Sequence, residues 1–114
     1  MAPAGTLLAP PPLAPPSPPR RRSRAKPKPP RSRLVVMSEL RGCAGMVLEL
    51  ALLDGTAAPQ ASILTWANRL AAEMDLEGVG SPANYRDLLH GIVTLSRRAL
   101  ADPDRPMVAL PPAA

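Results

Sequence analysis

The sequence predicts an all-α protein: a small three-helix unit, or a helical hairpin with a looser first helix, behind a disordered N-terminal tail rich in Pro and Arg. Three observations lead to this prediction. Apolar residues recur at spacings of three and four in three segments that follow residue 33. Aromatic residues make up only 2% of the chain, so its core must consist of aliphatic side chains, which suit packed helices better than a β-sandwich. Pro and Gly separate the three segments, where they are expected to end helices.

The first helix is expected from about residue 34 to residue 53. Its apolar stripe is formed by Val36, Leu40, Cys43, Val47 and Leu50. The sequence "DGTAAP" should end it, because Gly55 can adopt the left-handed C-cap conformation and Pro59 blocks continuation. Gly42 and Gly45 each weaken a helix by roughly 1 kcal/mol relative to Ala. Two alternatives follow: the helix is short or broken near Arg41, or these small residues let a second helix approach closely.

The second helix is expected over residues 59–76 and the third over residues 82–101. Ser81 and Pro82 suit the N-cap and first position of the third helix. "DPDRP" should end it, which gives a helical domain at 34–103 and a disordered C-terminal tail at 104–114. The apolar residues on these two helices are Ile63, Trp66, Ala67, Leu70, Ala71, Met74, Tyr85, Leu88, Leu89, Ile92, Leu95, Ala99 and Leu100.

The N-terminal tail, residues 1–33, holds eight of the 14 Lys and Arg residues, 11 of the 17 Pro residues and no acidic residue. Its formal charge is +8 and that of residues 34–114 is −3, which together give the +5 of the chain. Such an asymmetry suggests contact with a polyanion, and DNA or RNA phosphates are the expected targets. The residues expected to make this contact are Arg20, Arg21, Arg22, Arg24, Lys26, Lys28, Arg31 and Arg33.

Other interpretations of the tail remain open. The run "PRRRSRAKPK" also resembles a nuclear localisation signal, and Pro16 to Arg21 matches a PxxPxR peptide of the kind that SH3 domains bind. The tail can also be a solvated segment without a partner. Finally, the composition after Met37 is typical of a globular protein. Translation from Met37 is therefore an alternative, and the tail would then be absent.

Candidate chemistry is sparse. Cys43 and His90 are the single cysteine and the single histidine, and neither lies in a nucleophile or metal-binding motif, so we expect no enzyme, no metal and no cofactor. Arg86, Arg97 and Arg98, with His90, give the third helix a secondary basic face. This helix could enter a DNA groove as in a helix-turn-helix, but about six residues separate it from the second helix, whereas such turns have three or four.

The apolar residues of the first helix exceed what one helical hairpin can cover. We therefore expect a homo-oligomer or a complex with a larger protein. The interface residues expected are Leu40, Val47, Leu48, Leu50, Trp66 and Leu70. The function predicted is that of a small non-enzymatic interaction or adaptor protein. The alternative is a nucleic-acid-associated accessory protein, for example of a virus or phage.

A membrane location is not expected. The longest apolar stretch, "GMVLELALL", has nine residues including Glu49, whereas a spanning helix needs about 20. A soluble protein is predicted, cytoplasmic in a prokaryote or in a virus that infects one, with a nuclear location as the eukaryotic alternative.

Overall fold

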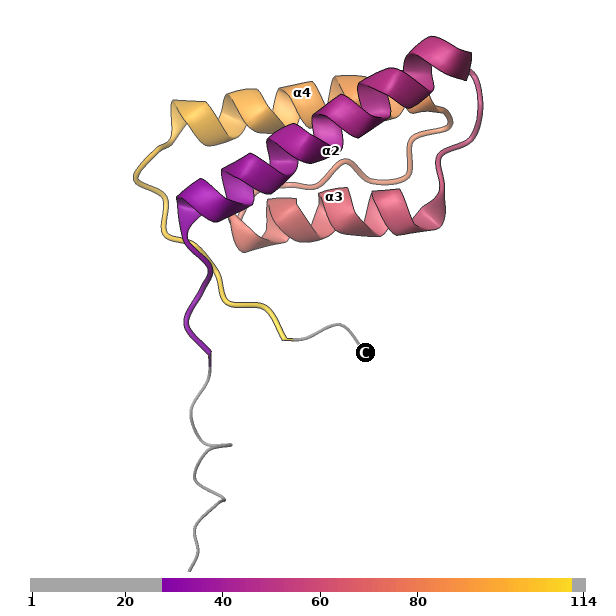
Figure 1. The fold of residues 1–114 in the computed structure, drawn as a ribbon. Helices are drawn as coiled ribbons and strands as arrows, with labels where there is room; N and C mark the ends of the chain where they lie inside the picture. Colours follow the sequence, from indigo (N-terminus) through magenta and orange to yellow (C-terminus); the bar gives the residue numbers. More distant parts are fainter. Residues whose placement is uncertain (1–27, 112–114) are drawn as a thin grey trace, which may run out of the picture.

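The computed structural model describes residues 28–111, which form three α-helices in a compact bundle (Figure 1). These are α2 (Arg33–Asp54), α3 (Ala61–Glu73) and α4 (Tyr85–Ala101). The all-α prediction is confirmed, and the three-helix unit is the form that the chain adopts. The expected tail residues 1–27, and residues 112–114, lie outside the described part of the chain.

The longest helix, α2, contacts both other helices, most extensively α4. It runs antiparallel to α4, since Arg33 at its start reaches the Ala99 carbonyl and Gly55 after its end accepts a hydrogen bond from the Arg86 backbone N–H. The helix is continuous through Gly42, so the alternative of a break near Arg41 is wrong. Packing of the buried face offsets the weak helix propensity of the glycines.

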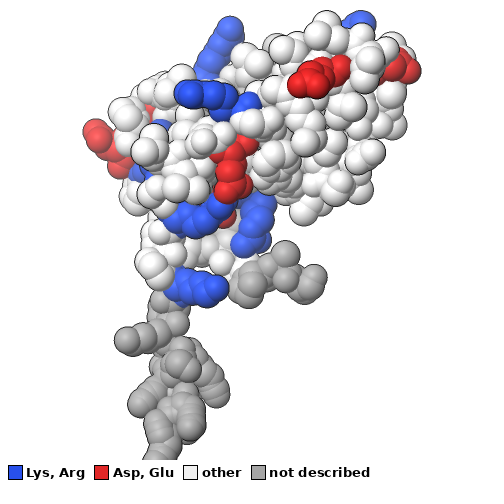
Figure 2. Space-filling model, in the orientation of Figure 1, with Lys and Arg blue, Asp and Glu red and all other residues white. Residues whose placement is uncertain are grey.

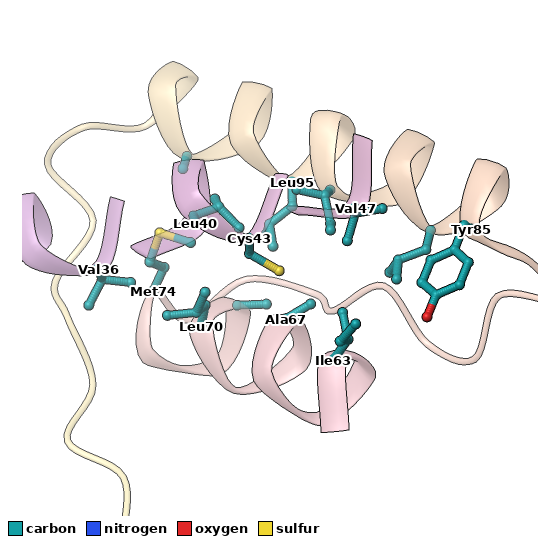
Figure 3. Close-up of a cluster of buried hydrophobic side chains, with 14 residues drawn as sticks. Val36, Leu40, Cys43, Val47, Ile63, Ala67, Leu70, Met74, Tyr85 and Leu95 are labelled. Atoms are coloured by element: carbon teal, nitrogen blue, oxygen red, sulfur yellow. The ribbon is translucent and has the colours of Figure 1, made fainter. Parts of the chain in front are cut away.

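The core lies between the three helices and is almost entirely aliphatic, with Cys43 near its middle (Figure 3). Successive turns of each helix contribute to it, as the spacing of apolar residues predicts. Its buried members are Val36, Leu40, Cys43, Val47, Ile63, Ala67, Leu70, Ala71, Met74, Tyr85, Leu88, Ile92, Leu95 and Ala99.

The helix ends differ from the expected ones. Asn84, and not Ser81, caps α4: its Oδ1 accepts from the Asp87 backbone N–H at 2.8 Å. Ser32 caps α2 in the same way, accepting from the Val35 N–H at 3.2 Å. Gly55 follows α2 in the right-handed conformation, with φ of −64°, rather than the left-handed one expected. Its small size matters instead, because a Cβ there would approach the Ala51 carbonyl oxygen at 3.0 Å.

The segment after α4 was expected to be a disordered tail from residue 104. Within the described residues this expectation is wrong, because residues 105–108 pack on the bundle. The Val108 N–H donates to the Glu73 carbonyl at 2.7 Å, and Met107 packs against the core. Arg105 adds ion pairs to Asp75 and Asp102 at 3.1 and 2.9 Å.

Candidate interaction surface

One face of α2 points away from the core and is rich in leucine. Its residues recur at spacings of four and three, the heptad period of helices that pack against each other. We call this set the outer face: Leu34, Ser38, Arg41, Gly45, Leu48 and Leu52. Leu34 and Leu52 are 81% and 77% exposed, and Leu48 is 46% exposed. Three leucines on one helical row therefore contribute little to the core of this chain.

Further apolar side chains lie beside the outer face. Val35, Met46 and Leu53 are exposed on the adjoining side of α2, Val35 near its start and Met46 and Leu53 in the half that ends at the upper right of Figure 1. Figure 2 shows charged side chains at the left and centre of this view and also at its upper right, whereas the lower right is uncharged. Most of the exposed large apolar side chains of α2 lie in its C-terminal half, namely Met46, Leu48, Leu52 and Leu53.

The two glycines of α2 leave this surface open. A Cβ added at Gly42 or at Gly45 would meet nothing within 4 Å. Neither glycine is therefore required for packing inside the described chain. Both lie on exposed positions of the helix, where they remove side-chain bulk between Leu34 and Leu48.

The six predicted interface residues differ in how far they are exposed in the structure. Leu40, Val47 and Leu70 are buried in the core of the single chain, so they are not available to a partner, and their inclusion in an interface is corrected. Leu50 and Trp66 are half-buried against the core. Leu48 alone of the six is exposed. Sequence periodicity identified apolar positions on α2, but the helix has two apolar sides, and only the fold shows which one faces inward.

The eight residues predicted to contact a polyanion also differ in their surroundings. Arg20, Arg21, Arg22, Arg24 and Lys26 lie outside the described residues. Lys28 is exposed at the start of the described chain. Arg31 and Arg33, in contrast, are bound by the helical unit, and this corrects their assignment as free cations of the tail. The Arg33 guanidinium donates to the Ala99 carbonyl, which is among the last carbonyls of α4 and lacks a complete set of helical partners.

Arg31 joins two carboxylates from different helices. Its Nη2 donates to Glu73 Oε2 at 2.7 Å and its Nε to both Glu73 oxygens at 3.1 Å, while Nη1 binds Glu39. Glu39 also accepts from the Trp66 indole N–H at 3.3 Å. Glu73 is only 5% exposed, so its charge requires a partner. The bidentate contact is the geometry in which Arg binds carboxylates most strongly.

This cluster shifts the ionisation of its members. The hydrogen bond from Arg31 lowers the pKa of Glu39, and the Trp66 N–H lowers it further against the opposing effect of burial. The hydrogen bonds to Glu39 and Glu73 raise the pKa of Arg31 above its ordinary value. A hollow of about 390 Å³ lies beside the cluster, between residues 28–31 and 108–110. Of its charged lining residues, Arg31, Glu39 and Glu73 are joined by these contacts, whereas Lys28 and Arg69 form no ion pair within residues 28–111.

The residues of the predicted secondary basic face all lie on α4. Arg86, Arg97 and Arg98 are all exposed, and Arg98 forms an exposed ion pair with Glu77 at 3.1 Å. His90 lies on the same side as Arg98, where both line a shallow hollow of about 350 Å³. The three arginines and His90 thus lie on the solvent-exposed side of α4, and their side chains do not form a single binding site.

The single cysteine and histidine are not brought together. The Cys43 sulfur points into the aliphatic core, whereas His90 is exposed on α4. Burial raises the pKa of the Cys43 thiol, which disfavours the reactive thiolate. Within residues 28–111, no group of three or more His, Cys, Asp or Glu side chains is arranged to hold a metal ion.

No protein-family model matches the chain, and neither a curated protein nor a solved structure matches it. Of the helices in residues 28–111, none combines the length and the hydropathy needed to cross a membrane.

Proposed function

We propose that this protein is a small non-enzymatic interaction or adaptor module that binds protein through the exposed leucines of α2. The observation that carries the proposal is the outer face, where Leu34, Leu48 and Leu52 remain exposed on a helix whose opposite side already forms the core. Transferring one such side chain from water into an apolar contact contributes about 1.5–3 kcal/mol. A partner that covers three of them gains a substantial part of a binding free energy.

The arrangement of the core supports this proposal. Val36, Leu40, Cys43 and Val47 fill one side of α2 and are fully or almost fully buried by α3 and α4. The outer leucines are therefore not needed to close the bundle. Clustered leucines on an exposed helix face are a typical feature of surfaces that bind another helix or a groove.

The experiment compares Leu48→Arg with Ser62→Arg in the full chain. Both positions are exposed on helices and both variants gain one positive charge, but Ser62 lies on α3, away from the outer face. Chemical cross-linking in the native cell, followed by purification of the protein, identifies its binding partners, including further copies of itself. We expect Leu48→Arg to lose them and Ser62→Arg to retain them, because burying an unpaired charge in an apolar contact is costly.

Two results would overturn the proposal. One is an unchanged set of cross-linked proteins with Leu48→Arg, provided that its circular dichroism and melting match those of Ser62→Arg. The other is the absence of any cross-linked protein with the unaltered chain. The melting measurement separates loss of binding from loss of fold.

A second candidate function is contact with nucleic acid through the basic tail. The observation that favours it is the run of six cations from Arg20 to Lys28, which remains once Arg31 and Arg33 are assigned to the helical unit. Each cation that meets a phosphate releases counterions, so binding should be insensitive to sequence and should weaken steeply with salt.

Titration of duplex DNA and of RNA at two salt concentrations tests this candidate. The full chain is compared with a variant in which the six cations from Arg20 to Lys28 are replaced by Gln, because deletion through residue 33 would also remove Arg31 and Arg33. We expect the Gln variant to lose binding. Equal binding by both would shift the contact to Arg86, Arg97 and Arg98, and no binding by either would remove this candidate.

A further inference from the structure

We infer that the partner of the outer face is a second copy of the same chain, packed antiparallel so that the two copies of α2 cross at Gly45. This inference rests on the proposed function, because it names the occupant of the same surface. Its three supports are the spacing of the outer face, the placement of Arg41 and of the neighbouring Glu49, and the open space at Gly42 and Gly45.

The charges specify the direction of pairing. Arg41 and Glu49 are both exposed and lie four residues before and four residues after Gly45. Within one helix they are about 12 Å apart along the axis, too far to meet. In an antiparallel pair centred on Gly45, each Arg41 lies opposite Glu49 of the other copy. In a parallel pair in register, Arg41 would face Arg41 and Glu49 would face Glu49, which is unfavourable.

Neither charge is already used inside the described chain. Among residues 28–111, the ion pairs involve Arg31, Arg98 and Arg105 on the basic side, and Glu39, Glu73, Asp75, Glu77 and Asp102 on the acidic side. Two new ion pairs, related by the two-fold axis, therefore form without breaking an existing one. Such a self-complementary contact is the usual form of a homodimer interface.

The glycines allow the two backbones to come close. The same antiparallel register brings Leu48 of one copy over Gly42 of the other, where no side chain and no neighbouring atom occupies the space. A leucine knob can then enter the hole that a larger residue would fill. At the axis itself, Gly45 meets Gly45, so that no pair of Cβ atoms holds the helices apart.

The most exposed leucines meet at the two ends of the same contact. Leu52 of one copy lies opposite Ser38 of the other, with Leu34 one turn away on the same row. Leu34 and Leu52 are the two outer-face leucines with the greatest exposure, so they gain most from being covered. One geometry thus covers Leu48 and Leu52 with the facing helix, leaves Leu34 beside its end, and pairs Arg41 with Glu49.

Charge reversal tests this geometry in the full chain. Sedimentation of the unaltered protein should show a dimer, with a dissociation constant in the range of about 1–100 µM that a short helix pair supports. Arg41→Glu and Glu49→Arg should each weaken the dimer by about tenfold or more, because each places two like-charge pairs across the axis. The double variant Arg41→Glu/Glu49→Arg should recover to within about threefold of the unaltered protein, since opposite charges again face each other.

Gly45→Ala provides an independent measurement. The added methyl group has open space in the single chain, so the monomer should melt at a higher temperature. Dimerisation should nevertheless weaken, by about tenfold, because two methyl groups meet at the crossing point. A purely structural glycine would show the first effect without the second.

Each outcome has a defined consequence. A protein that stays monomeric at about 500 µM, well above the expected dissociation constant, overturns self-pairing. A dimer whose double charge variant stays as weak as the single variants overturns the antiparallel geometry. Neither result removes the proposed function, because loss of heterologous cross-linked proteins in Leu48→Arg would still support a surface that binds a different protein.

Discussion

The role of Arg31 in the fold differs from the role that its position in the sequence suggests. By sequence it belongs to the basic run, and in the structure it is the partner of the buried Glu73 and of Glu39. Its positive charge is therefore used inside the molecule. The charge of the N-terminal segment that remains free for a polyanion is correspondingly smaller than composition suggests.

We predict that Arg31→Ala destabilises the protein by about 1–3 kcal/mol, the cost of leaving the Glu73 carboxylate buried with fewer hydrogen bonds. Urea unfolding at neutral pH measures the change. Arg97→Ala is the matched control, because Arg97 is an exposed arginine that makes no ion pair within residues 28–111, and its midpoint should stay close to that of the unaltered protein. Equal midpoints for the two variants would contradict a structural role of Arg31.

The same cluster predicts a pH dependence. Arg31 lowers the pKa of Glu39 below its ordinary value of 4.5 in the folded state. A lowered folded pKa gives stability that is present above the ordinary value and is lost as the pH falls through the folded one. The free energy of unfolding should therefore fall as the pH is lowered below 4.5. It should fall less steeply in Glu39→Gln. Urea midpoints at several acidic pH values for both proteins test this, and identical slopes would remove Glu39 as a contributor.

The burial of Cys43 predicts how readily a reagent reaches its thiol. Its thiol is buried in the core and its pKa is raised by that burial, so the native protein should react with a thiol reagent far more slowly than the unfolded chain. Reaction rates with and without denaturant measure the protection. Reaction of the native protein as fast as that of the unfolded chain would mean that the core opens readily around α2.

At the scale of the elements, the connection between α3 and α4 depends on one side chain. Asn68 on α3 accepts from the backbone N–H groups of Val79 and Gly80 at 2.7 and 3.2 Å, and donates to the Gly80 carbonyl at 3.0 Å. Gly80 has a positive φ of 69°. At Gly78 a Cβ would lie 2.2 Å from Asn68 Oδ1. The side chain and the two glycines together hold the loop against α3.

Asn68→Ala should therefore cost about 1–3 kcal/mol, because it leaves partly buried backbone groups without partners. Gln60→Ala is the control: Gln60 also carries an amide side chain, but it makes no capping hydrogen bond at the start of α3. Hydrogen exchange of the Val79 amide provides a local measurement, with faster exchange expected in Asn68→Ala. Unchanged protection of Val79 would show that the loop is held by other contacts.

At the scale of the whole molecule, the segment before α2 is part of the helical unit. Ser32 caps the helix, Arg31 and Arg33 reach α3 and α4, and Val36 is fully buried. A chain that starts at Met37 would lack all four contributions. The boundary expected after Arg33 thus separates residues that the fold joins.

We predict that a chain starting at Met37 is less stable than one starting at Lys28 by several kcal/mol. Loss of the buried Val36 side chain alone accounts for about 1.5–3 kcal/mol, and the cap and the Arg31 contacts add to it. Urea unfolding of the two shortened chains provides the comparison. Similar midpoints would show that the bundle is complete without residues 28–36.

The sequence by itself determined the class of the fold and the identity of the helices. Spacing of Val36, Leu40, Cys43 and Val47 marks one face of α2, and the faces of α3 and α4 are marked in the same way, because a helix repeats every 3.6 residues whatever its surroundings. Local signals at the helix ends were less informative. The capping pattern pointed to Ser81, whereas Asn84 is the cap in the structure.

Only the tertiary structure decided which side of α2 is buried, which cations are free, and where the ordered chain ends. Leu40 and Leu48 look alike in sequence, yet one is in the core and the other in solvent. Arg31 and Glu73 are 42 residues apart, and the Val108 to Glu73 hydrogen bond joins segments that share no local pattern. Such contacts depend on which elements meet in space, and local periodicity marks the apolar face of a helix without specifying what that face packs against.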